Sequence, residues 1–543
     1  MNREVSVALV LIGLEDSWQA PMDQINQDEA ATDNVLPISK LWNAARKVSR
    51  QLFVGDHWTL PFFRSLSPID RLPPDILGEI FSWALDDNQS MEDRRHLLLE
   101  PLTLSHVSSR WRAAALSKPT LWSTIWVDRP RAVHVPMVKL WLENSRGCPL
   151  ALCLRQSPSQ PPQTPQTPQT PADPPEHAIT DEILLLFIAH LFRWKKILFS
   201  FRTVTQRSLL TLPDLPKAAP LLEHVQMKVD SWDPVSARDV QRIMYSYVSV
   251  RIVALDRHTA LTFVPWAQLT HLDARTLHCP IDWYLKVFMR CPSLRSAVIM
   301  CSRNPDDHPF VTPPLCGILR HLSSFTVSAH RVDLGPLFDA LILPKLESLT
   351  IVYSSAPRQS DDPQALHRLL GRSGVFLKRF SLKDITATTD DERHLSYLRH
   401  HRMDSLIDLF MDVDMTDKII NFLIHLCADD GGALTRPLPH IQTMTLKDFR
   451  GEHITDLTLY SMVISRLGTA GLNTNDRYPG ALRAAEFYLR LKGHYTSPVL
   501  PFLVERCRDY IDLRINFLPC EDPHARVGRY TSSPLAGGYL IEG

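Results

Sequence analysis

Net charge and glycine are the features that this chain of 543 residues most clearly lacks. Lys+Arg 59 and Asp+Glu 59 give a formal net charge of 59 − 59 = 0. Without a positive excess the chain has no electrostatic footprint of a general nucleic-acid binder, so we expect no nucleic-acid partner. The 19 glycines are outnumbered by 42 prolines. This ratio disfavours a glycine-rich dinucleotide fold and favours short elements that end at prolines.

Cysteines and long apolar runs are also scarce. Nine cysteines in a chain of this length are too few for a disulfide scaffold, which favours a reducing compartment, the cytoplasm or the nucleus. The nearest pair, Cys148 and Cys153, has no second Cys/His pair at zinc-like spacing, so we expect no metal. The apolar run from Val5 to Leu14 is too short to span a bilayer, and acidic residues follow it where a signal-peptide cleavage site needs small ones. We expect no membrane association.

The sequence carries none of the common catalytic signatures. It has no glycine-rich phosphate loop, no H-E-x-x-H and no G-x-S-x-G. The acidic pair Asp361-Asp362 lies in a polar stretch typical of solvated surface, and His400-His401 lie between arginines without a carboxylate or thiol at ligand spacing. We therefore expect no enzymatic activity and no cofactor. A hydrolase whose site is assembled from distant residues stays as an alternative, because sequence spacing does not exclude it.

Changes in composition divide the chain into six parts. They are a poorly defined extension (1–65) with one amphipathic stretch, Ser39 to Phe53; a helical domain (66–127); a connection (128–156); a loop rich in Pro, Gln and Thr (157–176); a repeat-like region (177–520); and a tail (521–543). The loop is built on Gln-Thr-Pro units, which cannot bury a core, so we expect it to be disordered and solvated.

Residues 177–520 repeat one short apolar pattern, in which an apolar residue is followed by others three and five positions later. Eleven such triplets begin at Trp194, Leu222, Val250, Leu269, Leu294, Leu322, Leu346, Leu377, Leu406, Ile441 and Leu482. The last two side chains of each triplet would share one face of a strand. Successive starts differ by 19 (269 − 250) to 41 (482 − 441) residues, around the leucine-rich-repeat period of roughly 20–29. The alternative is that so permissive a pattern recurs by chance.

Prolines and helical patterns separate these triplets. Pro344 stands two residues before Leu346, where it would fix the backbone ahead of the strand. Helices are expected between strands, for example from Ile281 to Met289 and from Asp417 to Cys427. A strand–helix unit cannot bury its apolar strand face alone, so neighbouring units must stack. The expected fold class is therefore α/β: a short three-helix domain followed by an irregular solenoid, with parallel strands on the concave face and helices outside.

The helical domain contains the most specific motif. Leu72-Pro73 ends an extended approach, and Pro74-Asp75 suit a first helical turn. An apolar stripe follows at helical spacing, formed by Ile76, Leu77, Ile80, Phe81 and Ala84. Two further helical segments, Leu102 to Val107 and Ser108 to Ala115, lead to Pro119-Thr120-Leu121-Trp122. Three helices this short have more apolar surface than they can bury among themselves.

These motifs resemble the F-box family, in the form common in mushroom-type fungi, where a P-x-L-W phrase follows the box and leucine-rich repeats follow the phrase. The resemblance covers residues 66–127 directly and supports the whole layout loosely. Two features depart from the family pattern: the polar insertion from Asp86 to Glu100, and Ser108 in place of the usual cysteine. The resemblance implies a docking surface for the Skp-type adaptor of an SCF ubiquitin ligase, formed by Leu72, Pro73, Ile76, Leu77, Ile80, Leu104, Val107 and Trp111.

The function that the resemblance implies is a substrate receptor. The F-box would bind the Skp-type adaptor and, through it, a cullin ligase, while the repeats would bind an unknown target protein. A scaffold acting outside ubiquitination and the hydrolase are the alternatives. For Leu77, Phe81 and Trp111, burial in the helical core competes with docking, whereas Leu72, Pro73 and Ile76 lie near the start of the first helix and are the favoured contacts.

Overall fold

The computed structural model describes residues 68–85, 100–157, 175–201, 206–229, 232–302, 317–355, 362, 364–384, 391–424, 427–428, 434–435, 437–448, 454–467, 482–490, 499–507, 511–518 and 529–532. The chain forms two compact units, one of Met1–Val250 and His258–Val264, the other of Arg251–Arg257 and Pro265–Gly543. The stretch Ser39 to Phe53, most of the loop 157–176, and most of the insertion from Asp86 to Glu100 lie outside the described residues.

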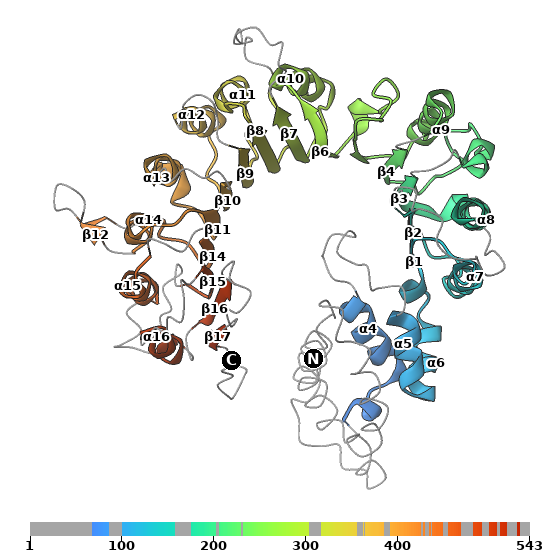
Figure 1. Ribbon diagram of the computed structural model, residues 1–543, viewed down its shortest axis with the longest axis horizontal. Helices are drawn as coiled ribbons and strands as arrows, with labels where there is room; N and C mark the ends of the chain where they lie inside the picture. The colour runs from blue at the N-terminus through green and yellow to red at the C-terminus, as the bar shows by residue number, and fades with distance from the viewer. Residues whose placement is uncertain are drawn as a thin grey trace, which may run out of the picture. The chain divides into compact units, whose positions relative to one another are not determined.

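The first unit opens with helices and continues with alternating strands and helices. Its elements are η2 (Pro68–Arg71), α4 (Pro74–Leu85), α5 (Glu100–Val107), α6 (Ser109–Ser117), η4 (Pro119–Trp122), β1 (Thr124–Asp128), α7 (His134–Asn144), β2 (Leu150–Arg155), α8 (Glu176–Ile188), η5 (Leu191–Arg193), β3 (Trp194–Phe201), η6 (Arg207–Thr211), β4 (His224–Val229) and α9 (Pro234–Ser246). Strands β1 to β4 pair in parallel and in chain order. Helices α7, α8 and α9 lie along one face of these strands (Figure 1).

The second unit repeats the strand–helix alternation more often. Its elements are β5 (Ile252–Ala254), η7 (Trp266–Gln268), β6 (His271–Cys279), α10 (Ile281–Arg290), β7 (Ser296–Ser302), β8 (Ser324–His330), α11 (Gly335–Ala340), β9 (Ser348–Ser355), α12 (Gln364–Ser373), β10 (Arg379–Asp384), α13 (Asp391–Leu398), η8 (His401–Met403), β11 (Asp408–Val413), α14 (Asp417–Phe422), β12 (Cys427–Ala428), β13 (Leu434–Thr435), β14 (Thr443–Asp448), α15 (Asp456–Arg466), β15 (Ala484–Arg490), α16 (Val499–Cys507), β16 (Asp512–Leu518) and β17 (Arg529–Ser532).

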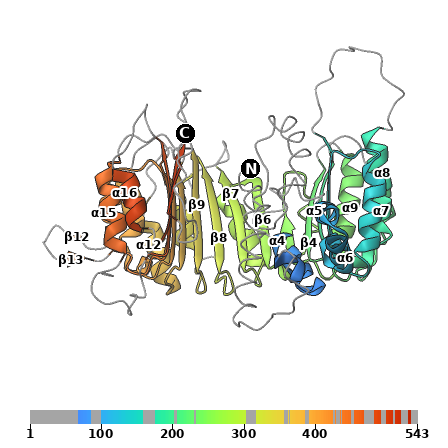
Figure 2. The ribbon, with the colours of Figure 1, turned by 90° about the horizontal axis from the view of Figure 1, so that it is seen from below.

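Parallel pairing in the second unit runs from β5 to β11 and on through β14, β15 and β16. Among the described strands of this sheet, only β17 pairs antiparallel with its neighbour. Figures 1 and 2 show helices α10 to α16 on one face of these strands. A parallel strand must be followed by a crossover, and here the crossovers are mostly these helices. The expectation of a mixed α/β chain with stacked strand–helix units is therefore confirmed, and the arrangement is compatible with a solenoid.

The apolar triplets explain where the strands form. All eleven coincide with strands, β3 to β11, β14 and β15, and every triplet side chain is buried. In the middle of the second unit, Leu349 of β9 lies opposite Phe325 of β8 and Phe380 of β10. The core is therefore a continuous apolar layer between strands and helices, which no single unit could complete.

Two local expectations need correction. The helix expected from Asp417 to Cys427 ends at Phe422, where Leu423 caps it, and Cys427 belongs to the short strand β12. The parallel sheet also begins earlier than the repeat pattern suggested, because β1 and β2 precede the Pro/Gln/Thr-rich loop. No helix within the described ranges combines the length and apolar character that crossing a bilayer requires.

Candidate protein-docking surfaces

Helices α4, α5 and α6 bury part of the expected docking set in their own interior. Leu72, Leu77, Ile80 and Leu104 are all buried. Phe81 is buried too, and its ring packs against that of Trp111 with centroids 4.9 Å apart. These side chains hold the three helices together, so the apolar stripe of α4 serves mainly as core in this chain.

The remaining members of the expected docking set are accessible. Pro73 is exposed, Ile76 and Trp111 are half-buried, and Val107 at the end of α5 is 40% exposed. Two apolar residues that the sequence motif did not single out join them: Trp83 is 51% exposed and Leu116 is 39% exposed. Trp83 lies seven positions after Ile76 on α4, so the two share a helix face. The small helical domain thus keeps large apolar side chains in contact with solvent.

Polar contacts fix the relative positions of these helices. The Arg110 guanidinium donates a hydrogen bond to the Leu72 carbonyl, and Lys118 forms an ion pair with Glu79 of α4. Ser108, which stands where the resembled family usually has cysteine, accepts a hydrogen bond from the Trp111 backbone N–H at 3.1 Å. The serine therefore caps the start of α6, a role that cysteine fills poorly.

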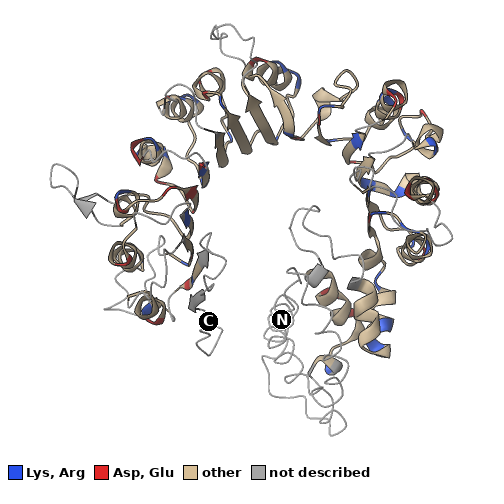
Figure 3. Ribbon diagram, viewed as in Figure 1, with Lys and Arg blue, Asp and Glu red and all other residues tan. Residues whose placement is uncertain are grey.

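A second surface is the strand face of the second unit that points away from the helices, here called the open face. On β7, β8 and β9 it consists of uncharged side chains: Ser296, Val298, Met300, Ser324, Thr326, Ser328, Ser348, Thr350 and Val352. In Figure 3 these three strands carry little blue or red. Charged residues flank this stretch. Asp273 of β6, paired with Arg275, precedes it, and charged and aromatic residues follow it from β10 to β16: Arg379, Lys383, Asp408, Phe410, Asp412, Lys447, Glu486, Tyr488, Asp512 and Arg514.

Lysines and aromatic rings alternate on the second half of the open face. Lys383 Nζ lies 5.1 Å from the centroid of the Phe410 ring, and Lys447 Nζ lies 5.6 Å from the same centroid. Lys447 Nζ is also 4.7 Å from the Tyr488 ring centroid. Aromatic residues are enriched at surfaces that recognise other proteins, and the lysines beside these rings are attracted to the ring faces.

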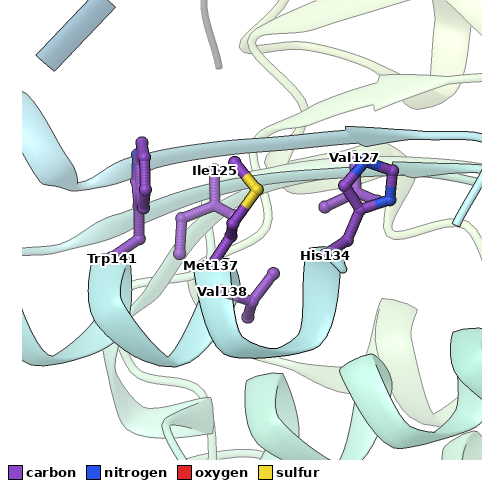
Figure 4. Close-up of a pocket in the computed structure, with 6 residues that line it drawn as sticks. All are labelled: Ile125, Val127, His134, Met137, Val138 and Trp141. Carbon is purple, nitrogen blue, oxygen red and sulfur yellow. The ribbon is translucent and has the colours of Figure 1, made fainter. Parts of the chain in front are cut away.

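A small apolar pocket lies between α7 and β1. Figure 4 shows its lining, which consists of Ile125, Val127, His134, Met137, Val138 and Trp141. Its cavity volume is about 10 Å³, far below the roughly 300–1,000 Å³ of typical ligand sites. Its one ionisable group is His134, whose pKa is lowered by burial and by the neighbouring Arg131. This pocket has the character of a packing gap rather than of a reaction site.

The second unit also contains a buried ionic cluster. Asp384, at the end of β10, accepts hydrogen bonds from the Arg393 guanidinium and from His394 Nε2, the latter at 3.1 Å. Arg393 also lies over the Tyr353 ring, 4.9 Å from its centroid. Because Asp384, Arg393 and His394 are all buried, a substrate has no direct access to them. The cluster fastens α13 to the strands.

Neither metal ligation nor thiol chemistry has a clear place in the described part of the chain. Across the described ranges, His, Cys, Asp and Glu side chains form no group of three that could hold a metal ion. Six cysteines there are free thiols. Burial raises the pKa of Cys153 to about 12 and that of Cys291 to about 12, which keeps both thiols protonated and poorly nucleophilic.

No protein-family model matches this chain, and no curated protein matches it either. Its function must therefore be inferred from its own residues: the solvent-exposed apolar side chains of α4 to α6 and the open face of the strands.

Proposed function

We propose that this protein is a non-catalytic adaptor that joins two other proteins. Helices α4 to α6 dock the Skp-type adaptor of an SCF ubiquitin ligase, as the resemblance of residues 66–127 to F-box proteins implies, and the strand array binds the target protein. The observation that carries the proposal is the exposure of Trp83 and Val107 on a helical domain with little room to bury them. We infer that they belong to one contiguous apolar patch, the kind of surface that marks protein-interaction sites.

The accessible residues are the expected contacts in this docking. Pro73, Ile76, Trp83, Val107 and Trp111 are the side chains that a partner could reach. Leu77, Ile80 and Leu104 would act indirectly, by keeping the helices in place. In most interfaces a few aromatic or large apolar anchors provide most of the binding free energy, and each costs roughly 1–4 kcal/mol on truncation.

The open face is the proposed surface for the target protein. Its residues point away from the helices that complete the core, so binding there would leave the fold unchanged. The uncharged half on β7 to β9 suits a neutral contact, and the lysine and aromatic side chains on β10 to β15 add charge and ring contacts. Such a division lets one surface bind a partner in a single orientation.

Binding of the full chain to a purified Skp-type adaptor protein, measured by isothermal titration calorimetry, tests the proposal. We expect Trp83→Ala and Val107→Ala each to weaken binding by about tenfold or more, because each removes a surface anchor. Phe192→Ala is the matched control, since Phe192 is also an exposed aromatic residue of the first unit but lies in η5. It should leave affinity unchanged, and circular dichroism should show all three variants folded.

Other outcomes select the alternatives. Undiminished binding by both α4–α5 variants, or no binding by the unaltered chain, would rule out this docking surface. Complexes that contain the Skp-type adaptor without a cullin would favour the scaffold role. Hydrolytic turnover by the purified chain alone would favour an enzyme.

A further inference from the structure

Three histidines of the second unit stack on one another where two successive repeats meet. The His400 ring lies between those of His367 and His401, with centroids 4.6 Å and 4.4 Å away. His367 belongs to α12, whereas His401 is the first residue of η8, which follows α13, and His400 is the N-cap residue just before it. The stack continues outward, because the His401 ring contacts Phe376 edge-on and the Arg402 guanidinium lies over Phe376 at 5.1 Å. The stack therefore links the turn after α12 to the next repeat.

Hydrogen bonds of His400 and His367 show which of their ring nitrogen atoms donate and which accept. His400 Nδ1 accepts a hydrogen bond from the Arg402 backbone N–H at 3.3 Å and so caps η8. A ring nitrogen that accepts a hydrogen bond carries no proton. His367 differs, because its Nε2 donates to the Ser396 carbonyl oxygen at 2.7 Å. Protonation would therefore remove an acceptor at His400, whereas the donor at His367 would survive.

The element that His400 caps is tied to the turn after α12. The Leu377 N–H donates to the Arg402 carbonyl at 3.2 Å, and Arg402 Nη1 reaches the Val375 carbonyl at 3.4 Å. A protonated His400 would also place a positive charge against two other histidine rings at van der Waals distance. We propose that the His367–His400–His401 stack is an acid-sensitive joint between repeats, which holds η8 against the turn after α12 while His400 is neutral and releases it when His400 takes up a proton.

The charged surroundings determine the direction of the response. Arg402 flanks His400 on η8, and Arg399 at the end of α13 is held by Glu392. Acidic groups are present as well: Asp362 favours the charged form of His367, and Asp404 lies near His401 and His440. Burial, followed by the charges of His367, His401 and Arg402, lowers the pKa of His400 from 6.5 to about 4. At His400, the effect of burial and of the positive neighbours on the pKa therefore exceeds that of the nearby carboxylates.

The pH window follows from this shift. Above pH 6.5 His400 is neutral in both the open and the closed joint, and its contribution to closure is complete. As the pH falls from 6.5 towards 4, His400 takes up a proton in the open joint but resists protonation in the closed joint. The open joint is therefore favoured progressively as the pH falls. The His400 ring is only half-buried, so solvent screens its charge. We therefore expect the equilibrium constant for closing the joint to fall about tenfold, which is less than the whole pKa shift would give. This joint is independent of the proposed docking role.

Hydrogen exchange of the full chain, expressed as protection factors at pH 7.0 and pH 4.5, tests the joint. The peptide spanning Arg399 to Leu406 should lose about tenfold in protection at the lower pH. The peptide of β9 should keep its protection, because it lies in the packed sheet. In His400→Asn the asparagine oxygen still caps η8 but does not titrate, so protection should be the same at both pH values.

Two control variants isolate His400. His271 also has a pKa lowered by burial and by Arg295, but it lies on β6 outside the stack, so His271→Asn should keep the acid response. Asp404→Asn should keep it too. The proposal is overturned if the unaltered chain shows no loss at Arg399 to Leu406, if β9 loses protection equally, if His400→Asn retains the loss, or if Asp404→Asn abolishes it.

Discussion

Buried arginines complete the hydrogen bonding of loops that leave the sheet. Arg466, in the last turn of α15, is buried and donates from Nε to the Leu423 carbonyl at 2.6 Å, from Nη1 to the Leu438 carbonyl at 3.1 Å and from Nη2 to the Pro437 carbonyl at 3.1 Å. Leu438 has a φ of 50°, so this segment departs from regular structure. The guanidinium thus donates to three carbonyls that lie at the end of α14 and in the loop before β14.

Replacing the Arg466 guanidinium by the single ammonium group of lysine should therefore lower the stability of the fold. We expect Arg466→Lys to lower the free energy of unfolding of the full chain by about 2–4 kcal/mol, because one nitrogen atom cannot reach three separated carbonyls and at least one stays buried without a donor. Urea unfolding followed by circular dichroism measures the change. Arg506→Lys, on an exposed position of α16, is the matched control. A change within about 0.5 kcal/mol for both variants would contradict this account.

At the scale of elements, the same hydrogen bond recurs at two tryptophans, one just before β1 and one at the first residue of β3. Trp122 Nε1 donates to the Ala115 carbonyl at 2.9 Å, and Trp194 Nε1 donates to the Phe187 carbonyl at 2.8 Å. In both cases the acceptor lies seven residues earlier, near the end of the preceding helix. The P-x-L-W motif therefore forms the turn that leads from α6 into β1.

Because the two tryptophans make the same hydrogen bond, we expect their substitution to lower stability by similar amounts. Trp122→Phe and Trp194→Phe should each lower the free energy of unfolding by about 0.5–1.5 kcal/mol, since each removes one buried hydrogen bond from the indole to a carbonyl near a helix end. Trp283→Phe, at a half-buried position of α10, removes the same ring volume and should cost clearly less. Thermal unfolding of the three variants makes the comparison. Equal losses at all three positions would show that ring size, not the hydrogen bond, matters.

The same turn shows how far the sequence could predict the elements. Eleven strands were predictable because a strand that buries one face repeats apolar residues at fixed spacing. Trp122, Ile125 and Val127 follow that very spacing, so β1 was equally accessible to the pattern. The helix at Asp417 was predicted too long, because apolar periodicity continued past Leu423 while the chain turned.

The docking residues were harder to predict for a physical reason. Periodicity identifies an apolar stripe on α4 but not which part of the stripe faces neighbouring helices. Leu77 and Phe81 turn inward and Phe81 meets Trp111, whereas Ile76, only one residue before Leu77, stays half-buried. The exposure of Trp83 depends on that same tertiary choice and had no signal in the motif. Which side of a short helix is covered is decided by contacts far apart in sequence.

At the scale of the whole molecule, stability should be a sum of local terms. Strands of the large sheet pair in chain order, with β12 and β13 outside it, and core residues meet their counterparts one repeat before and one repeat after, as Leu349 meets Phe325 and Phe380. In such a stack a defect is felt by adjacent repeats and fades with distance. The division of the chain into two compact units reinforces this expectation.

Leu349→Ala tests the local character of the fold. The substitution leaves a cavity in the middle of the second unit and should cost about 2–5 kcal/mol. Hydrogen exchange of the full chain should show faster exchange in β8, β9 and β10, with β2 and β3 of the first unit unchanged. Thr350→Ala, the next residue on the open face, should have little effect on either unit. Equal acceleration in both units would mean that the chain unfolds as one cooperative body, because a purely nearest-neighbour stack cannot transmit the loss of one side chain that far.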